Sequence, residues 1–316
     1  MHDNTIQPEK AIAVAVERKG ADRDLAFEHL KELESLAKTA GAEIVEKVYQ
    51  ELDRPNPKTV LGKGKVEEIK LMLLEDDYSM IIFDDDLSPA QVKNLENALK
   101  VKVLDRSGLI LDIFAQHARS LEAKLQVELA QSQYLLPRLT RMWTHLSKQY
   151  GGVGTKGPGE TQIETDRRML KIRIQLLKEK ISEISVQKEQ QRKGRASLPR
   201  YALVGYTNAG KSTLMNMLTE AGVYVENKLF ATLDTTVRSF ELPSGQKALI
   251  SDTVGFIRKL PTHLVASFRS TLAEAAEADV LVHVVDVSHP YFRMHIKAVE
   301  DTLESLNIKD RPTLLV

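Results

Sequence analysis

Cysteine is absent from these 316 residues, which excludes disulfide bonds and thiolate metal sites. Aromatic residues make up only 5%, whereas hydrophobic residues reach 42% and charged residues 28%, the composition of a soluble globular protein. Apolar runs such as Val280–Val285 are far shorter than the ~20 residues that a membrane-spanning helix needs. The polar segment Met1–Lys10 does not have the pattern of a signal peptide. We therefore expect a cytoplasmic protein without membrane insertion.

An excess of charge of either sign is also absent, because 44 Lys and Arg balance 44 Asp and Glu. A protein that is basic over its whole surface is thus excluded. The charges are unevenly placed, since the segment from Arg138 to Arg200 holds fifteen basic residues against six acidic ones. Such a concentration is typical of a surface that contacts nucleic acid, and the alternative is a solvated helical face.

The N-terminal third alternates short apolar runs with amphipathic segments. The expected strands are Ala11–Val16, Glu43–Tyr49, Met80–Phe83 and Val101–Leu104, and the expected helices are Asp22–Thr39, Val66–Leu74 and Pro89–Leu99. This alternation predicts a small α/β domain with a mainly parallel sheet.

Two polar stretches in this region allow more than one interpretation. Asp84–Asp86 has the composition of a metal cluster, but Ser88–Gln91 has the pattern of a helix N-terminus, near which acidic residues are favoured. We therefore interpret the acids as part of a strand-to-helix turn. The loop Arg54–Lys65 is basic and contains glycine, and we interpret it as a candidate contact for a polyanion.

A long helical pattern begins near Ser107, with apolar residues at alternating spacings of four and three. The first series is Leu125, Leu129, Ser132, Leu136, Leu139, Trp143 and Leu146, and the second is Ile163, Leu170, Ile174, Leu177, Ile181 and Ile184. The glycine-rich segment Tyr150–Gly159 joins them, so the pattern predicts an antiparallel helical hairpin. Pro137 is expected to kink its first arm.

The expected domains are residues 1–106, a helical hairpin over 107–193, a linker over 194–199 and a nucleotide domain over 200–316. The tip of the hairpin is rich in glycine, and no acidic residue occurs from Arg138 to Gly159. The candidate RNA contacts are Arg138, Arg141, Lys148 and Lys156. A positive tip on a helical stalk suits contact with the phosphates of structured RNA, and the alternative is a simple chain reversal.

The clearest signal is the G-x-x-x-x-G-K-S pattern of Gly205–Ser212, between the apolar run Tyr201–Val204 and the helix-like Thr213–Leu218. Strand, glycine-containing loop and helix in this order are typical of a P-loop, whose backbone amides surround a phosphate. Lys211 would reach the β- and γ-phosphates, and Ser212 would offer its hydroxyl to Mg²⁺.

A second signature, D-x-x-G, follows the expected strand Lys247–Ile250. In this position Asp252 would hold Mg²⁺ through water, and the Gly255 amide would meet the γ-phosphate. The polar segment Asn227–Thr236 between the two signatures suits a mobile switch. These residues predict an α/β P-loop domain that binds a nucleoside triphosphate.

Several stretches together resemble the HflX translation-associated GTPases of the Obg–HflX group. The stretches are Phe83–Gln91, Leu111–Arg119, Lys124–Ala130, Gly151–Arg168, Gly205–Ser212, Phe230–Asp234 and Asp252–Phe256. The resemblance covers the chain from about residue 10 onward. It implies a GTPase that binds GTP and GDP with Mg²⁺, with ATP also accepted in some members. Such a protein binds the large ribosomal subunit as a monomer and helps to dissociate or rescue stalled ribosomes.

Site residues follow from the resemblance by position. It implies a first switch at Phe230–Asp234, a second switch at Asp252–Gly255 and direct magnesium ligands Ser212 and Thr232, with Lys211, Thr232 and Gly255 acting in hydrolysis. The expected nucleotide contacts are Gly205, Tyr206, Thr207, Asn208, Ala209, Gly210, Lys211, Ser212, Phe230, Ala231, Thr232, Leu233, Asp234, Asp252, Thr253, Val254 and Gly255.

Two further positions bear on hydrolysis. Asn208 matches a P-loop asparagine that coordinates K⁺ in related GTPases, with a local turn bond as the alternative. Phe256 stands where Ras-like enzymes carry the glutamine that orients the attacking water, and a phenyl ring cannot do this. We therefore expect slow intrinsic turnover.

The N-K-x-D signature that reads guanine would follow a strand beginning near Thr313–Val316, where these residues end. Guanine as the base thus rests on the resemblance, and we expect this incomplete domain to bind GTP and ATP weakly, with little preference. The alternatives are an ATP-using P-loop enzyme, such as a small-molecule kinase, and an RNA-binding module with an inactive nucleotide domain.

Overall fold

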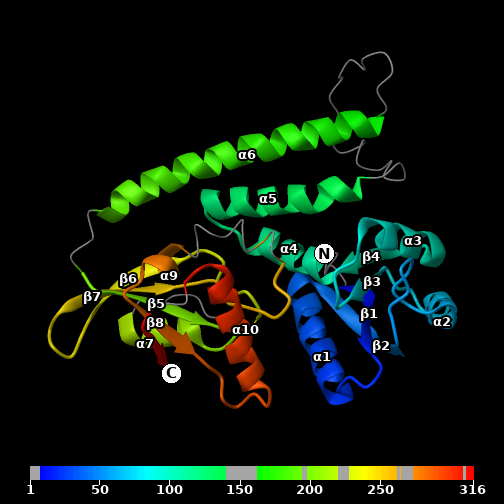
Figure 1. Ribbon diagram of the computed structural model, residues 1–316, viewed down its shortest axis with the longest axis horizontal. Coiled ribbons are helices and arrows are strands. Elements are labelled where there is room, and N and C mark those ends of the chain that lie inside the picture. Colours follow the sequence, from blue (N-terminus) through cyan, green and yellow to red (C-terminus); the bar gives the residue numbers. More distant parts are fainter. Residues whose placement is uncertain are drawn as a thin grey trace, which may run out of the picture. The chain divides into compact units, whose positions relative to one another are not determined.

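The computed structural model describes residues 8–139, 162–193, 198–219, 228–261, 264, 273–308 and 311–316, and the side chains of 162, 188–193 and 273 are not part of this description. Its contacts divide the chain into two compact units, Met1–Gln116 and His117–Val316. The two units are described separately. Figure 1 shows their helices and strands in sequence colours.

The first unit is built on a four-stranded parallel sheet. Its strands are β1 (Glu9–Arg18), β2 (Ala42–Leu52), β3 (Met80–Phe83) and β4 (Lys102–Asp105), in the order β2-β1-β3-β4. Its helices are α1 (Arg23–Ala40), α2 (Lys63–Glu75), α3 (Pro89–Leu99) and α4 (Arg106–His117). All four residues of β3 are buried, as expected for a parallel strand that is covered on both faces. The predicted α/β class with a parallel sheet is confirmed.

Local capping residues explain where α1 begins and ends and where α3 begins. Asp22 accepts hydrogen bonds from the amides of Asp24 and Leu25 at the start of α1, and Gly41 ends the helix with a φ of 92°. Ser88 and Gln91 form the predicted capping box at the start of α3.

The acidic cluster Asp84–Asp86 follows β3 and bonds to residues that follow β4. Asp84 accepts a 2.9 Å hydrogen bond from the fully buried guanidinium of Arg106, which also pairs with Glu32. Asp86 accepts a 2.5 Å bond from the Ser107 hydroxyl. The acids lie in the predicted turn between β3 and α3, and their side chains bind residues at the start of α4. Among the described residues, no group of three or more His, Asp or Glu side chains is arranged to hold a metal.

The second unit begins with two long helices that pack together. They are α5 (Leu121–Leu135) and α6 (Gln162–Lys193), which run side by side (Figure 1). Leu125, Leu129 and Leu177 form the buried seam, and Ile174, Ile181 and Ile184 pack against it. Arg167 donates a 2.7 Å bond to the Leu139 carbonyl, and Arg173 pairs with Glu128 at 2.6 Å, so the chains run antiparallel. The helical hairpin is confirmed for these residues.

Helix α5 ends next to the position at which a kink was predicted. Helix α5 stops at Leu135 and is followed by one 3₁₀ turn, Leu136–Arg138. Pro137 lacks an amide hydrogen and so cannot continue the α-helical ladder, and within the described residues the proline ends the helix. Trp143, Leu146 and the glycine-rich segment Tyr150–Gly159 lie outside the described residues.

The remainder of this unit is an α/β domain with a five-stranded sheet. Its strands are β5 (Arg200–Gly205), β6 (Thr236–Glu241), β7 (Lys247–Asp252), β8 (Val280–Val284) and β9 (Thr313–Leu315), with helices α7 (Lys211–Thr219), α9 (Ala273–Glu277) and α10 (Phe292–Ser305). The strand order is β6-β7-β5-β8-β9, and only β6 among these strands is antiparallel to its neighbour. The carboxyl ends of β5, β7 and β8 therefore meet at one edge, where open α/β sheets bind ligands.

The expected domain limits remain a prediction. The sequence boundary between residues 106 and 107 falls at the start of α4, whereas the compact units divide after Gln116. Helix α4 is apolar and largely buried, which explains its assignment to the first unit. In the part of the chain that the structure describes, no helix is long and apolar enough to span a membrane.

Candidate functional site

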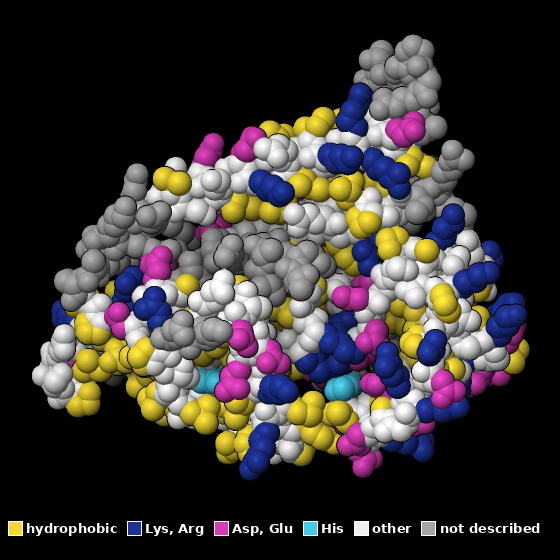
Figure 2. Space-filling view, in the orientation of Figure 1, with side chains coloured by type: hydrophobic (Ala, Val, Ile, Leu, Met, Phe, Trp, Pro, Cys, Tyr) yellow, Lys and Arg dark blue, Asp and Glu magenta, His cyan; other side chains and the backbone are white. Residues whose placement is uncertain are grey.

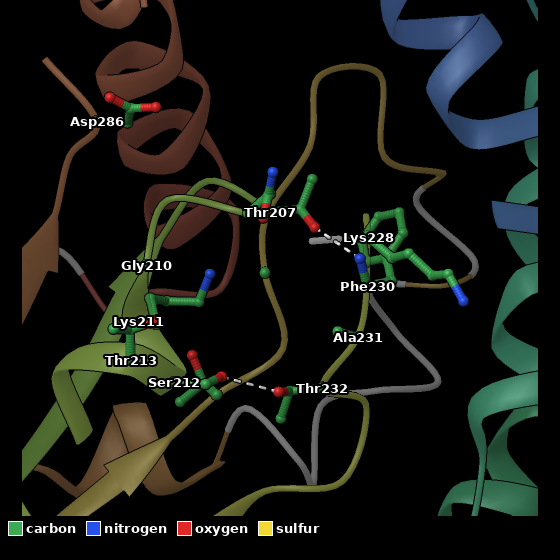
Figure 3. A pocket seen from close by; sticks show the side chains of 13 residues that line it. Thr207, Gly210, Lys211, Ser212, Thr213, Lys228, Phe230, Ala231, Thr232 and Asp286 are labelled. Atoms are coloured by element: carbon green, nitrogen blue, oxygen red, sulfur yellow. Dashed lines mark hydrogen bonds between the residues drawn. The ribbon is translucent and has the colours of Figure 1, made fainter. Parts of the chain in front are cut away.

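The loop between β5 and α7 takes the shape that its two glycines permit. Gly205 has a φ of 154°, and a Cβ at this position would lie 2.4 Å from the carbonyl oxygen of Val284 in the neighbouring strand. Gly210 has a φ of 94° with open space around it, so its backbone conformation alone requires glycine. Strand, loop and helix therefore follow one another as the P-loop pattern predicts (Figure 3).

Lys211, the first residue of α7, is held inside this loop. Its side chain is buried, and its Nζ donates to the carbonyls of Tyr206 at 2.8 Å and Gly205 at 3.2 Å. Burial lowers the pKa of Lys211 to about 8, although the nearby carboxylate of Asp252 opposes this shift. A phosphate bound in the loop would place negative charge beside this ammonium group and so stabilise its charged form.

GTP affinity is expected to fall as pH rises through about 8. Above this pH the free protein holds Lys211 as a neutral amine, which attracts a triphosphate less than the ammonium does. A free-state pKa near 8 predicts a roughly tenfold loss of affinity between pH 7 and pH 9. Equilibrium titrations of a fluorescent GTP analogue across this range measure it. Lys211→Ala is the matched control, and an equal pH dependence in that variant contradicts the assignment.

Three oxygen-bearing side chains converge beside Lys211. The Ser212 hydroxyl donates to Asp252 Oδ2 at 2.5 Å. It also lies 3.0 Å from the Thr232 hydroxyl, a contact that Figure 3 shows. Burial raises the pKa of Asp252, while the bond from Ser212 and the charge of Lys211 lower it. Asp252 Oδ1 is buried and accepts no hydrogen bond from a described residue. Oxygen ligands with one unsatisfied carboxylate oxygen suit a hard divalent cation such as Mg²⁺.

The second switch lies against the P-loop. A Cβ on Gly255 would come within 2.6 Å of Thr207 Cα and 3.1 Å of Lys211 Nζ. The next residue, Phe256, donates its amide to the Gly205 carbonyl at 3.0 Å and accepts from the Thr207 amide at 2.7 Å. The side chain of Phe256 is buried. Its ring is therefore part of the core, where it cannot orient an attacking water.

The first switch is attached to the P-loop through Thr207. The Thr207 hydroxyl accepts a 2.7 Å hydrogen bond from the amide of Phe230, which is buried and has a φ of 57° (Figure 3). The P-loop pattern marked Thr207 only as a nucleotide contact. Its bond to a residue 23 positions away was not predictable from local spacing.

These elements enclose a cavity of about 390 Å³, which is in the size range of small-molecule sites. Ten expected residues line it: Thr207, Asn208, Gly210, Lys211, Ser212, Phe230, Ala231, Thr232, Thr253 and Gly255. Thr213, Lys228 and Asp286 also line it and were not expected. Asp286 follows β8, so its place at the carboxyl edge of the sheet is the signal that could have identified it.

The other expected contacts do not line the cavity; they are Gly205, Tyr206, Ala209, Leu233, Asp234, Asp252 and Val254. Tyr206 turns into the protein, where its ring stacks on His295 with centroids 3.8 Å apart, and its hydroxyl accepts from the Arg258 amide. Leu233 is buried. Asp234 binds the start of α5.

One RNA-contact candidate, Arg138, lies in the described part of the chain. Its guanidinium lies 3.5 Å from the centroid of the Tyr134 ring and donates to the Tyr134 carbonyl at 3.0 Å. Arg141, Lys148 and Lys156 lie outside the described residues, so their role remains a sequence-based prediction.

Three family models match successive parts of the chain. Residues 27–115 match the model described as GTP-binding GTPase N-terminal, and residues 117–195 match GTP-binding GTPase Middle Region. Residues 200–316 match the model described as 50S ribosome-binding GTPase. The matches follow the same order as the N-terminal sheet, the helical pair and the P-loop domain.

Individual relatives extend this similarity over the whole chain. GTPase HflX of Flavobacterium psychrophilum is 55% identical over 316 residues, which are all of this chain and 76% of the relative. GTPase HflX of Escherichia coli is 48% identical over 296 residues, 93% of this chain and 70% of the relative. The crystal structure of the SsGBP and GDP complex matches with a TM-score of 0.54 and 28% identity, covering 97% of this chain and 81% of that one. With the P-loop geometry and this similarity in agreement, the chain belongs to the HflX family and is a GTP-binding GTPase.

Proposed function

We propose that this GTPase binds the large ribosomal subunit and uses GTP to dissociate or rescue stalled ribosomes, acting as a cytoplasmic monomer. The observation that carries the proposal is the basic helical hairpin beside the nucleotide domain. The family model matched by residues 200–316 is described as a 50S ribosome-binding GTPase, which supports the same partner.

Basic side chains are exposed near the start of α6. Arg167, Arg168, Lys171 and Arg173 are exposed on the N-terminal part of α6, the end that follows the glycine-rich segment. Figure 2 shows Lys and Arg side chains along this helix on the face that it draws. Exposed guanidinium and ammonium groups bind RNA phosphates, which supply most of the sequence-independent affinity for nucleic acid.

GTP hydrolysis follows from the groups around the cavity. The P-loop amides and Lys211 would bind the β- and γ-phosphates, and the Gly255 amide would meet the γ-phosphate. Ser212 and Thr232 would hold Mg²⁺ directly and Asp252 through water, because their oxygens converge. When bound, Mg²⁺ would supply positive charge against the phosphate oxygens.

Potassium is a second cation that we propose for this site. Asn208 lines the cavity with a φ of 61°, a position from which its side chain would lie near bound phosphates. Hydrolysis assayed over a range of Mg²⁺, and in K⁺ against Na⁺, tests both cations. Because Phe256 is buried, intrinsic turnover is proposed to be slow and the partner to raise it.

The role of the tip is tested by charge reversal. Lys148→Glu combined with Lys156→Glu is expected to weaken binding to the large ribosomal subunit by tenfold or more and to reduce the salt slope by about two, because two phosphate contacts are lost. GTP affinity should not change. Sedimentation binding assays from about 50 to 200 mM salt measure this.

The matched control is Lys31→Glu combined with Lys70→Glu, which makes the same change of charge on exposed helices of the first unit. It should bind like the unaltered protein. Unchanged affinity and salt slope in the Lys148/Lys156 variant would show that the tip only reverses the chain.

A further inference from the structure

The last residue of the first switch has a partner outside the nucleotide site. Asp234 Oδ2 accepts hydrogen bonds from the amides of Arg119 at 2.9 Å and Ser120 at 3.2 Å, and Oδ1 accepts from the Ser120 hydroxyl. Ser120 is the N-cap of α5, where its Oγ also accepts a 3.1 Å bond from the Ala123 amide. The carboxylate therefore lies at the N-terminus of the first helix of the hairpin.

This placement suits the charge of Asp234. The first amides of a helix have no partner within the helix, and the helix dipole favours a negative charge beside them. Both carboxylate oxygens are used, and Asp234 does not line the nucleotide cavity. The sequence predicted Asp234 as a nucleotide contact, whereas its contacts connect the switch to α5.

The five residues of the first switch are held at three points. Phe230 is bound to Thr207 of the P-loop, Thr232 lies 3.0 Å from Ser212, and Asp234 is bound to α5. Thr232 lies two residues from each of the outer attachments. The position of its hydroxyl over the phosphate site therefore depends on both.

We propose that Asp234 is a positioning residue for GTP hydrolysis, which holds Thr232 in place by binding the N-terminus of α5. The contact also makes the switch and the hairpin interdependent. A nucleotide that orders the switch stabilises the start of α5, and a partner that moves α5 changes the switch by the same coupling free energy.

Hydrolysis by the full chain tests the positioning role. Asp234→Ala is expected to lower kcat about tenfold, within the usual range of such couplings, while KM for GTP and affinity for GDP stay within about twofold. Ser120→Ala should also lower kcat. The double variant should be no worse than Asp234→Ala alone, because both substitutions remove one shared contact.

Two further variants distinguish loss of the Asp234 contact from a general effect of removing a carboxylate. Asp234→Asn keeps an acceptor oxygen for the amides and is expected to retain more activity than Asp234→Ala. Asp301→Ala removes an exposed carboxylate from α10 and should hydrolyse GTP like the unaltered protein. Wild-type kcat in Asp234→Ala, or effects of Asp234→Ala and Ser120→Ala that simply multiply, would overturn the proposal.

Amide hydrogen exchange tests the coupling directly. If Asp234 only capped α5, the exchange rates at the start of this helix would not depend on which nucleotide is bound. In the unaltered protein, the amides of Arg119, Ser120 and Ala123 should exchange more slowly with a non-hydrolysable GTP analogue than with GDP. In Asp234→Ala this difference between nucleotides should disappear, although both nucleotides still bind. Exchange that is independent of nucleotide in the unaltered protein, or a difference that persists in the variant, contradicts the coupling.

Discussion

Replacing Lys211 by alanine is expected to weaken GTP binding by between about a hundredfold and a thousandfold and to remove measurable hydrolysis. Lys211 Nζ is buried in the loop and already donates to two P-loop carbonyls, so it needs no reorganisation to meet a phosphate. Losing one preorganised charged donor typically costs about 3–4 kcal/mol in a site of this kind. Titration of GTP and GDP, together with single-turnover hydrolysis, measures both effects.

Lys228→Ala is the matched control for this variant. Lys228 also lines the cavity, but its side chain is exposed, and exposed charges contribute little because water screens them. Its loss should change GTP affinity by less than about threefold. If Lys211→Ala also remained within threefold of the unaltered protein, the loop would not be the triphosphate site.

Gly255→Ala is expected to lower the rate of hydrolysis by about a hundredfold or more, with a much smaller loss of GDP affinity. The added Cβ would lie 2.6 Å from Thr207 Cα and 2.9 Å from Thr207 Cβ, a distance that no side-chain rotation relieves. The second switch must then move away from the P-loop, and the Gly255 amide is displaced from the γ-phosphate. Removing one such donor from a transition state costs about 10²–10³ in rate.

Gly64→Ala is the control for the same chemical change elsewhere. Gly64 lies in α2 of the first unit, has no atom within 4 Å of a Cβ and needs no positive φ, so alanine fits there. It should leave hydrolysis unchanged and stabilise the helix slightly. Hydrolysis of GTP by Gly255→Ala at the rate of the unaltered protein would show that the close contact with Thr207 is not needed in the reactive state.

Features set by neighbouring residues were predictable from the sequence. Strand Met80–Phe83 and helix Pro89–Leu99 occur with the predicted bounds, because a short apolar run and a capping box act over a few residues. The P-loop was predictable for the same reason: its glycines and the following helix start are local requirements of the backbone. The seam between α5 and α6 followed from the heptad spacing.

Predictions that depended on distant partners were less accurate. Asp84–Asp86 lie in the predicted turn between β3 and α3, but the sequence did not identify their partners, because Asp84 pairs with Arg106 and Asp86 with Ser107, both about twenty residues further along the chain. Pro137 was expected to kink an arm that in the described residues ends there. The spacing of apolar residues could not show whether Pro137 kinks the helix or ends it, because this depends on how the following segment packs.

Short motifs in the sequence were enough to predict the kind of chemistry: a phosphate-binding loop followed by a D-x-x-G signature, with a helical hairpin before them. Tertiary structure decided how the parts are connected. Thr207 holds Phe230, Gly255 lies against Thr207, and Asp234 binds the start of α5 at a separation of 114 residues. Local sequence patterns do not encode contacts between residues so far apart in the chain. These contacts form only when folding brings the carboxyl ends of β5 and β7 close to the start of α5.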